Sequence, residues 1–284
     1  MVDMARPFRS VLYIPGSKAR ALEKARSLPA DAIIFDLEDA VAPEEKCTAR
    51  ALLADTLTSG AFGARTVLVR VNGLETDWGE ADLRAAADMA VDGILLPKVN
   101  RPADVNAAGA IVAATPFWAM IETAEGVLNA PAIANHPRIA GFVLGTNDLL
   151  KELGAAPLPG RGPLATALQT ALLAARAAGI VCIDGVYNAF RDEAGLRAEC
   201  EAGRDLGMDG KSLIHPAQVE IANAVFAPSG DDIEAAGRVI AAHEAALAKG
   251  EGVAVLDGRI VENLHVETAN RVLAKARAIA EAQA

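Results

Sequence analysis

The chain has 284 residues, of which 52% are hydrophobic but only 4% aromatic, and its formal net charge is -10. This length and composition fit one α/β domain with a core of Ala, Val, Leu and Ile, plus a short appendage. The negative charge argues against nucleic acid and anionic membranes as partners, because both require a basic surface.

The sequence also lacks signals of export or membrane insertion. No stretch approaches the ~20 continuous apolar residues of a membrane span, and the first residues have no apolar signal-peptide core. Cys47, Cys182 and Cys200 have neither metal-ligand nor redox spacing, which favours reduced structural thiols. We therefore expect a cytoplasmic protein.

Eight short strand-like runs, most of them apolar, alternate with segments of helical spacing. The runs are residues 10–14, 32–35, 66–69, 93–96, 116–121, 141–144, 180–183 and 211–214. Helices are predicted between them, including 18–28 and 43–57, where a proline suits the first turn. Eight strand–helix units in about 220 residues predict a closed (β/α)8 TIM barrel rather than an open sheet.

The C-terminal segment follows a different pattern. It predicts a helix over 231–249, an extended arm over 252–261 and a helix over 264–282. We therefore expect residues 1–228 to form a catalytic barrel. Residues 229–284 have too little core for an independent domain and are expected to form a lid across the barrel mouth or a neighbouring subunit.

Two carboxylates stand at the ends of neighbouring predicted strands. Glu122 ends the run at 116–121, and Asp148 follows the run at 141–144. The carboxyl ends of parallel strands meet at one edge of a barrel, where active sites lie. Two hard oxygen ligands at this edge predict a divalent metal. The alternative is that each carboxylate caps the helix that follows.

Eight motifs at the predicted strand ends resemble those of the citrate lyase beta subunit and its relatives, the malyl-CoA and citramalyl-CoA lyases. The motifs are SVLYIPGS (10–17), FDLEDAV (35–41), VRVNG (69–73), LPKV (96–99), MIETA (120–124), GTNDL (145–149), DGVY (184–187) and GKSLIHP (210–216). They cover the chain from about Arg9 to the tail in the family's order. The resemblance does not select a substrate, because family members cleave different hydroxyacyl thioesters.

The resemblance implies a Mg²⁺ ion held by Glu122 and Asp148, a ligand set that suits magnesium. Three further acids are expected to steady its water ligands: Asp36, Glu38 and Asp39.

The resemblance also implies substrate contacts. Arg70 matches an arginine beside the substrate, where a fixed guanidinium stabilises an oxyanion. Pairing with the acid cluster is a compatible alternative. Backbone N–H groups at Gly145, Thr146 and Asn147 are expected to hold the substrate carboxylate.

The first loop resembles the family's coenzyme A site, and four residues are expected to contact CoA: Pro15, Gly16, Arg20 and Lys24. The two cations are one helical turn apart and can contact phosphate. Their alternative role is a solvated helix face. Lys98 and Lys211 also resemble family positions, and both catalysis and salt bridging stay open for them.

Lid-bearing relatives carry an Asp on the C-terminal arm that reaches the mouth of an adjacent subunit. The corresponding acid in this chain is Glu262, one methylene longer, with Asp257 as a nearby alternative. We expect Glu262 to act as the catalytic acid or base together with Arg70.

These features predict a Mg²⁺-dependent lyase that cleaves a 3-hydroxy-3-carboxyacyl-CoA thioester by a retro-Claisen reaction, giving a 2-oxo acid and an acyl-CoA. The alternatives are a citrate lyase beta subunit acting on a citryl acyl carrier protein, a malyl-CoA thioesterase, and a binding module without catalysis. The resemblance further implies a homo-oligomer, either a trimer or a hexamer.

Overall fold

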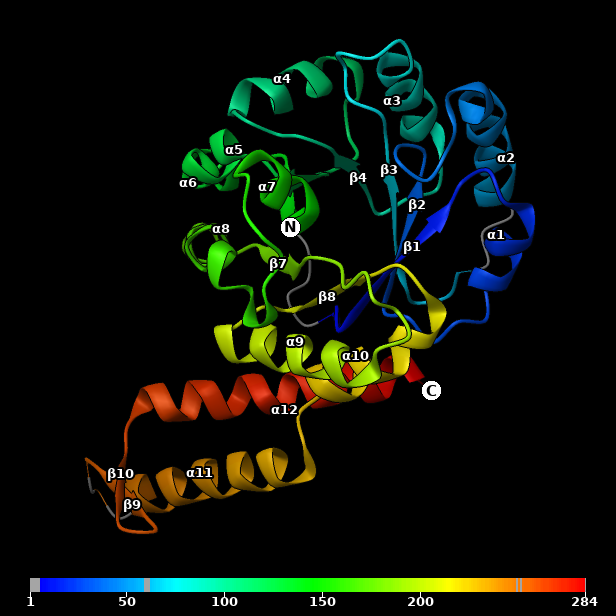
Figure 1. The fold of residues 1–284 in the computed structure, drawn as a ribbon. Helices are drawn as coiled ribbons and strands as arrows, with labels where there is room; N and C mark the ends of the chain where they lie inside the picture. The colour runs from blue at the N-terminus through cyan, green and yellow to red at the C-terminus, as the bar shows by residue number, and fades with distance from the viewer. Residues whose placement is uncertain (1–5, 59–61, 249, 251, 284) are drawn as a thin grey trace. The chain divides into compact units, whose positions relative to one another are not determined.

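The computed structural model describes residues 6–58, 62–248, 250 and 252–283, and Figure 1 shows the fold. Eight parallel strands close into a barrel in chain order. They are β1 (Ser10–Pro15), β2 (Ala32–Asp36), β3 (Thr66–Arg70), β4 (Gly93–Leu96), β5 (Phe117–Ile121), β6 (Ile139–Leu144), β7 (Val181–Asp184) and β8 (Gly210–Leu213). Val11 pairs with Ala32 of β2 on one side and with Ser212 of β8 on the other, which closes the barrel. The predicted barrel is confirmed.

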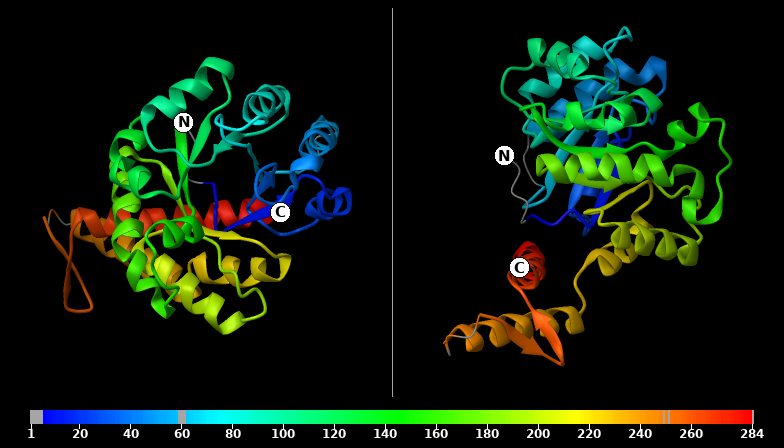
Figure 2. Two further views of the ribbon diagram at one scale, coloured as in Figure 1. Left: turned by 45° about the horizontal axis from the view of Figure 1, so that its top comes forward. Right: turned by 90° about the vertical axis from the view of Figure 1, so that its left-hand side faces the viewer.

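Helices surround the strands, as the two views of Figure 2 show. They are α1 (Ala19–Ala25), η1 (Pro43–Glu45), α2 (Lys46–Thr58), α3 (Gly79–Asp88), α4 (Pro102–Ile111), α5 (Ala124–Leu128), α6 (Ala130–Ala134), α7 (Thr146–Glu152), η2 (Pro159–Leu164), α8 (Ala165–Ala178), α9 (Glu193–Leu206), η3 (Pro216–Gln218) and α10 (Val219–Phe226). The predicted helix over 43–57 begins with a 3₁₀ turn, η1, before α2. The predicted helix over 18–28 is shorter, because α1 ends at Ala25.

Side chains of the strands alternate between the barrel interior and the helices, as the pleat of a strand requires. On β2, Ile33 and Phe35 pack in the large cluster under the helices, whereas Ala32 and Ile34 belong to the interior cluster. Asp36 has the same parity as Ile34. The last interior position of this strand is therefore a carboxylate at the barrel mouth.

Trp118 on β5 fills the barrel interior below the mouth. It is 1% exposed, and its indole ring lies 5.4 Å from the ring of Phe8. Two glycines make room for it, because a Cβ atom at Gly93 or Gly141 would lie 2.9 or 2.5 Å from the indole. The large ring fills the interior at the level of these residues, while the C-terminal ends of the strands border the pocket described below.

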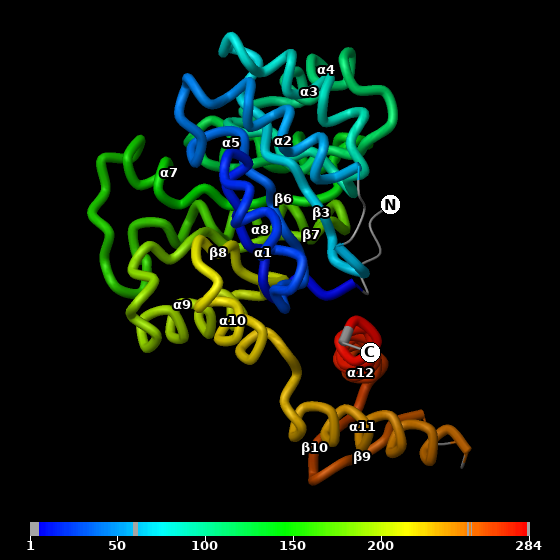
Figure 3. The backbone as a smooth tube through the Cα atoms, turned by 90° about the vertical axis from the view of Figure 1, so that its right-hand side faces the viewer, coloured from blue at the N-terminus to red at the C-terminus, as the bar shows by residue number. Residues whose placement is uncertain are grey.

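Residues 227–284 form a second unit, which Figure 3 traces along the backbone. It contains α11 (Gly230–Ala248), β9 (Ala254–Leu256), β10 (Arg259–Val261) and α12 (Asn263–Gln283). The two predicted helices are present, but Lys249, the predicted last residue of the first one, lies outside the described residues. The segment predicted as a plain extended arm is an antiparallel hairpin that turns through Asp257 and Gly258, with φ values of 49° and 75°.

The hairpin packs on α11 through a small apolar cluster of Ala246, Ala254 and Val261. That residues 229–284 act as a lid stays a prediction. Within the described part of the chain, no helix combines the length and the apolar character needed to span a membrane.

Candidate active site

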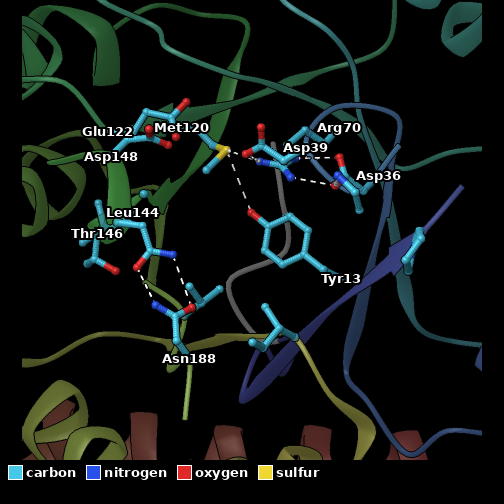
Figure 4. Close-up of a pocket in the computed structure, with 16 residues that line it drawn as sticks. Tyr13, Asp36, Asp39, Arg70, Met120, Glu122, Leu144, Thr146, Asp148 and Asn188 are labelled. Carbon is cyan, nitrogen blue, oxygen red and sulfur yellow. Dashed lines mark hydrogen bonds and ion pairs between the residues drawn. The ribbon is translucent and has the colours of Figure 1, made fainter. Parts of the chain in front are cut away.

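The interior faces of several strands end in polar or reactive side chains that border one pocket at the barrel mouth (Figure 4). The pocket has a volume of about 310 Å³. Its lining is Tyr13, Pro15, Asp36, Asp39, Ala40, Arg70, Met120, Glu122, Leu144, Gly145, Thr146, Asn147, Asp148, Val186, Asn188 and Ile214. The structure therefore brings together the predicted metal ligands, the predicted arginine and most of the predicted acids.

Arg70 is held by an acid cluster on one wall of the pocket. Its Nε and Nη2 atoms donate to the two carboxylate oxygens of Asp36, both at 2.7 Å, and its Nη1 lies 2.8 Å from Glu38 and 3.5 Å from Asp39. The guanidinium also lies over the ring of Tyr13, 5.0 Å from its centroid. Burial alone would lower the pKa of Arg70, but the attraction of Asp36 outweighs this effect and raises the pKa above its usual value. The guanidinium therefore stays charged. A bidentate pair of this kind fixes both position and charge.

Glu38, a second acid of this cluster, has a carboxyl group whose pKa is raised by its surroundings. Burial raises its pKa to about 7, Arg70 opposes that rise, and Asp39 and Asp36 add to it. Its second oxygen lies 4.0 Å from Nζ of Lys98. The carboxyl group can therefore gain or lose a proton near neutral pH.

Glu122 occupies the opposite wall, and Figure 4 shows it together with Asp148. Glu122 is only 2% exposed and accepts a hydrogen bond from the backbone N–H of Lys98 at 2.7 Å. Burial raises the pKa of Glu122 to about 7, the Lys98 N–H lowers it, and repulsion from Asp148 raises it. Gly145 leaves the space for this side chain, since a Cβ there would overlap with Cβ of Glu122.

This carboxylate pair fits a hard divalent cation. A buried carboxylate with a raised pKa lacks a compensating charge, which a cation can supply, and a few carboxylates plus water are the ligands that Mg²⁺ prefers. In the described residues, no group of three or more His, Cys, Asp or Glu side chains is placed to hold a metal. The fit is therefore to an ion that keeps several water or substrate ligands, and not to a closed structural site.

The predicted carboxylate-binding loop has a partly different role. The N–H of Gly145 donates to the carbonyl of Ile121 at 3.1 Å, within the barrel sheet. Thr146 and Asn147 open α7 and line the pocket. The N–H of Gly145 is therefore already used within the protein. The contribution of Gly145 to the site is the space that it leaves for the side chain of Glu122.

The four predicted CoA residues are separated. Pro15 lines the pocket, and Gly16 is buried with its N–H donating to the carbonyl of Asp36 at 2.8 Å. Arg20 and Lys24 are exposed on α1 and do not line the pocket. Their contact with CoA stays a prediction.

Glu262 belongs to the second unit, just before α12, and its side chain is exposed. Its N–H donates to Nδ1 of His265 at 2.9 Å. Asp257, the alternative acid, forms an ion pair with Arg238. Glu262 is therefore the less encumbered of the two, and its catalytic role stays a prediction.

A second cavity of about 520 Å³, which the sequence did not indicate, lies beside the pocket and shares Thr146, Asn147, Val186 and Asn188 with it. Asn147 and Asn188 hydrogen bond to each other reciprocally through their side-chain amides, at 2.7 and 3.3 Å.

An ion-pair network lies at this cavity. Lys211 is fully buried, with Nζ 2.8 Å from Glu199 and 3.1 Å from Asp184, and Nη1 of Arg161 lies 2.5 Å from Asp184. Opposite charges thus surround Lys211. Burial would raise the pKa of Asp184, but Lys211 and Arg161 together hold it below its usual range. Of the two roles open for Lys211, the structure places it in salt bridging.

Three comparisons show which known proteins this chain resembles. Residues 9–216 match the model of the HpcH/HpaI aldolase/citrate lyase family. A (3S)-malyl-CoA thioesterase of Cereibacter sphaeroides (strain KD131 / KCTC 12085) is 63% identical over 280 residues, covering 99% of this chain and 98% of the relative. The citrate lyase subunit beta of Leuconostoc mesenteroides subsp. cremoris is 38% identical, over 95% of this chain and 93% of the relative. The crystal structure of CitE from Mycobacterium tuberculosis with magnesium, acetoacetate and coenzyme A has a TM-score of 0.82 and 29% identity, covering 96% of this chain and 100% of that chain.

Proposed function

The chain belongs to the HpcH/HpaI aldolase/citrate lyase family, and we propose that it is a Mg²⁺-dependent enzyme that hydrolyses a malyl-CoA-type thioester to malate and free CoA. The observation that carries the choice of reaction is the 63% identity to a (3S)-malyl-CoA thioesterase over nearly the whole of both chains. Carbon–carbon cleavage of the same substrate is the second candidate. It is supported by the family match and by Arg70, which is fixed where an enolate oxygen could be stabilised.

In this proposal, Glu122 and Asp148 hold the Mg²⁺ ion, which supplies a Lewis acid for oxygen atoms of the substrate. Arg70 presents a fixed positive charge to the carbonyl oxygen on which negative charge develops in either reaction. Asp36 and Glu38 keep the guanidinium in place, so it need not reorganise during the reaction.

The two reactions differ in the bond that breaks. In hydrolysis, water adds to the thioester carbonyl, the carbon–sulfur bond breaks, and the thiolate takes up a proton. In lyase chemistry, the hydroxyl group of the substrate loses its proton and the carbon–carbon bond breaks. The products are a 2-oxo acid and a thioester enolate, which an acid then protonates. Glu262, supplied by a neighbouring subunit, is our proposed acid.

The products decide between these reactions. Purified protein is incubated with malyl-CoA and Mg²⁺ while free thiol and 2-oxo acid are measured separately. We expect thiol and malate in equal amounts. An equal yield of 2-oxo acid and acetyl-CoA would instead establish the lyase, and no turnover of any hydroxyacyl-CoA would favour a citryl acyl carrier protein as substrate. A Glu122→Gln variant controls for contaminating activity.

We also propose a homo-oligomer, as a trimer or hexamer, in which the second unit acts on a neighbouring mouth. The cytoplasm is the proposed compartment, supported by three cysteines that are all free thiols. Sedimentation of the purified protein tests the assembly, and a monomer at micromolar concentration would contradict it.

A further inference from the structure

Lys98 has an unfavourable backbone conformation immediately after β4. Its φ is 48°, in the left-handed region that L-residues other than Asn and Asp rarely adopt. Two other non-glycine residues in the described part of the chain share a positive φ, Arg161 and Asp257. Asp257 lies in a hairpin turn with Gly258, where a positive φ is normal. Glycine would relieve the strain at position 98, so the lysine side chain requires an explanation.

The backbone of Lys98 already has a role that does not need the side chain. Its N–H donates to Oε1 of Glu122 at 2.7 Å. Any residue except proline supplies this donor. This backbone role therefore leaves the lysine side chain unexplained, and the ammonium group is its distinctive part.

The ammonium group stands beside a strongly acidic mouth. Its Nζ lies 4.0 Å from Glu38, and the side chain is 49% exposed. Five carboxyl groups are gathered here: Asp36, Glu38, Asp39, Glu122 and Asp148. Arg70 neutralises part of their charge, and Lys98 also lowers the pKa of Glu38. Against five carboxyl groups, each of the two cations reduces the repulsion that a substrate carboxylate would meet.

We propose that Lys98 is a positioning residue whose ammonium group offsets the negative charge of the mouth, so that an anionic substrate binds beside the metal-binding carboxylates. This inference rests on the proposed function, because it takes a substrate that carries a carboxylate. It has a distinctive consequence for the two ligands. Loss of the ammonium charge should lower the affinity for the anionic substrate and raise the affinity for the metal cation. Simple damage to the site should lower both affinities.

The test uses Lys98→Met, which removes the charge and keeps an unbranched side chain, and Lys98→Arg, which keeps the charge. Calorimetry measures Mg²⁺ binding without substrate and malate binding in saturating Mg²⁺. For Lys98→Met we expect malate affinity to fall about fivefold and Mg²⁺ affinity to rise about twofold, from Coulomb interactions across a partly hydrated mouth. Both changes should shrink in 0.5 M salt, and Lys98→Arg should recover most of the malate affinity.

Two further variants complete the test. Lys98→Gly should show the same ligand affinities as Lys98→Met but a higher melting temperature, because glycine accepts the left-handed backbone. Arg84→Met removes an exposed cation that pairs with Glu80 on α3, and it should change neither affinity.

Unchanged malate affinity in Lys98→Met, or an equal loss of affinity for both ligands, would overturn the inference. If the wild-type protein neither binds malate nor turns over malyl-CoA, the proposed function fails on its own. Mg²⁺ affinity then decides the charge effect, which stands only if Lys98→Met binds Mg²⁺ more tightly.

Discussion

Replacing Glu122 with Gln should make the metal-free protein more stable while removing its response to magnesium. Burial raises the pKa of Glu122 from 4.5 to about 7. A carboxyl group with a raised pKa in the folded state gives its full stability below pH 4.5 and loses it as the pH rises through 7. A difference of one pKa unit between the folded and unfolded states changes the free energy of unfolding by ~1.4 kcal/mol. Ionised Glu122 therefore costs about 3 kcal/mol at pH 8 when no cation is bound.

The amide introduced by Glu122→Gln would keep the acceptor for the Lys98 N–H and would not ionise. At pH 8 without metal, Glu122→Gln should therefore melt about 5 °C above the wild type, and the two should converge near pH 4.5. With Mg²⁺ at 100 times its dissociation constant the wild type should gain ~2.7 kcal/mol, and the variant should gain little. The wild type and the variant should then have nearly equal stability.

Thermal melts from pH 4.5 to 8.5, with EDTA or with Mg²⁺, measure both effects. Glu125→Gln is the matched control, because Glu125 is a partly exposed acid on α5 that pairs with Arg101. It should show neither the pH-dependent gain nor the loss of magnesium response. A metal-free Glu122→Gln protein that is less stable than wild type at pH 8, or that gains as much from Mg²⁺, would refute the reasoning.

Three other substitutions test further residues of the proposed mechanism. Gly145→Ala should displace the carboxylate of Glu122, the proposed metal ligand, and weaken Mg²⁺ binding at least tenfold by calorimetry, whereas Gly162→Ala, whose Cβ would contact nothing within 4 Å, should not. Arg70→Ala leaves the buried Asp36 unpaired and should cost about 3 to 5 kcal/mol in denaturant unfolding; a loss below about 1 kcal/mol would contradict a buried pair. Glu262→Gln should lower turnover by roughly 100-fold with little change in thioester binding, and normal turnover would identify this acid as a surface residue.

The barrel could be predicted because most of its strands are almost wholly buried and read as apolar runs; β8, which contains Lys211 and Ser212, is an exception. β2 and β5 are buried at every position, and the polar residue that follows β5 is Glu122, the predicted metal ligand. The same regularity placed Asp148 at the mouth. The predicted strand boundaries differ from the observed ones by a few residues. For example, β6 begins at Ile139, two residues before the predicted run.

Long-range pairing was not predictable from the sequence. Lys211 is neutralised by Asp184 and Glu199, which are 27 and 12 residues away, and their approach depends on the curvature of the barrel. The hairpin of the second unit did have a local signal. Asp257 and Gly258 form the Asp-Gly pair that is typical of a tight turn between strands, and the extended-arm prediction overlooked it.

The reciprocal amide pair of Asn147 and Asn188 places groups that carry no charge in the lining of both neighbouring cavities. Side-chain amides do not titrate at any pH at which the protein would be handled, and salt screens them little. Each of the two hydrogen bonds is neutral and worth ~1 kcal/mol net. Acidity and ionic strength will therefore act on the charged groups of the acidic mouth and leave this amide pair intact.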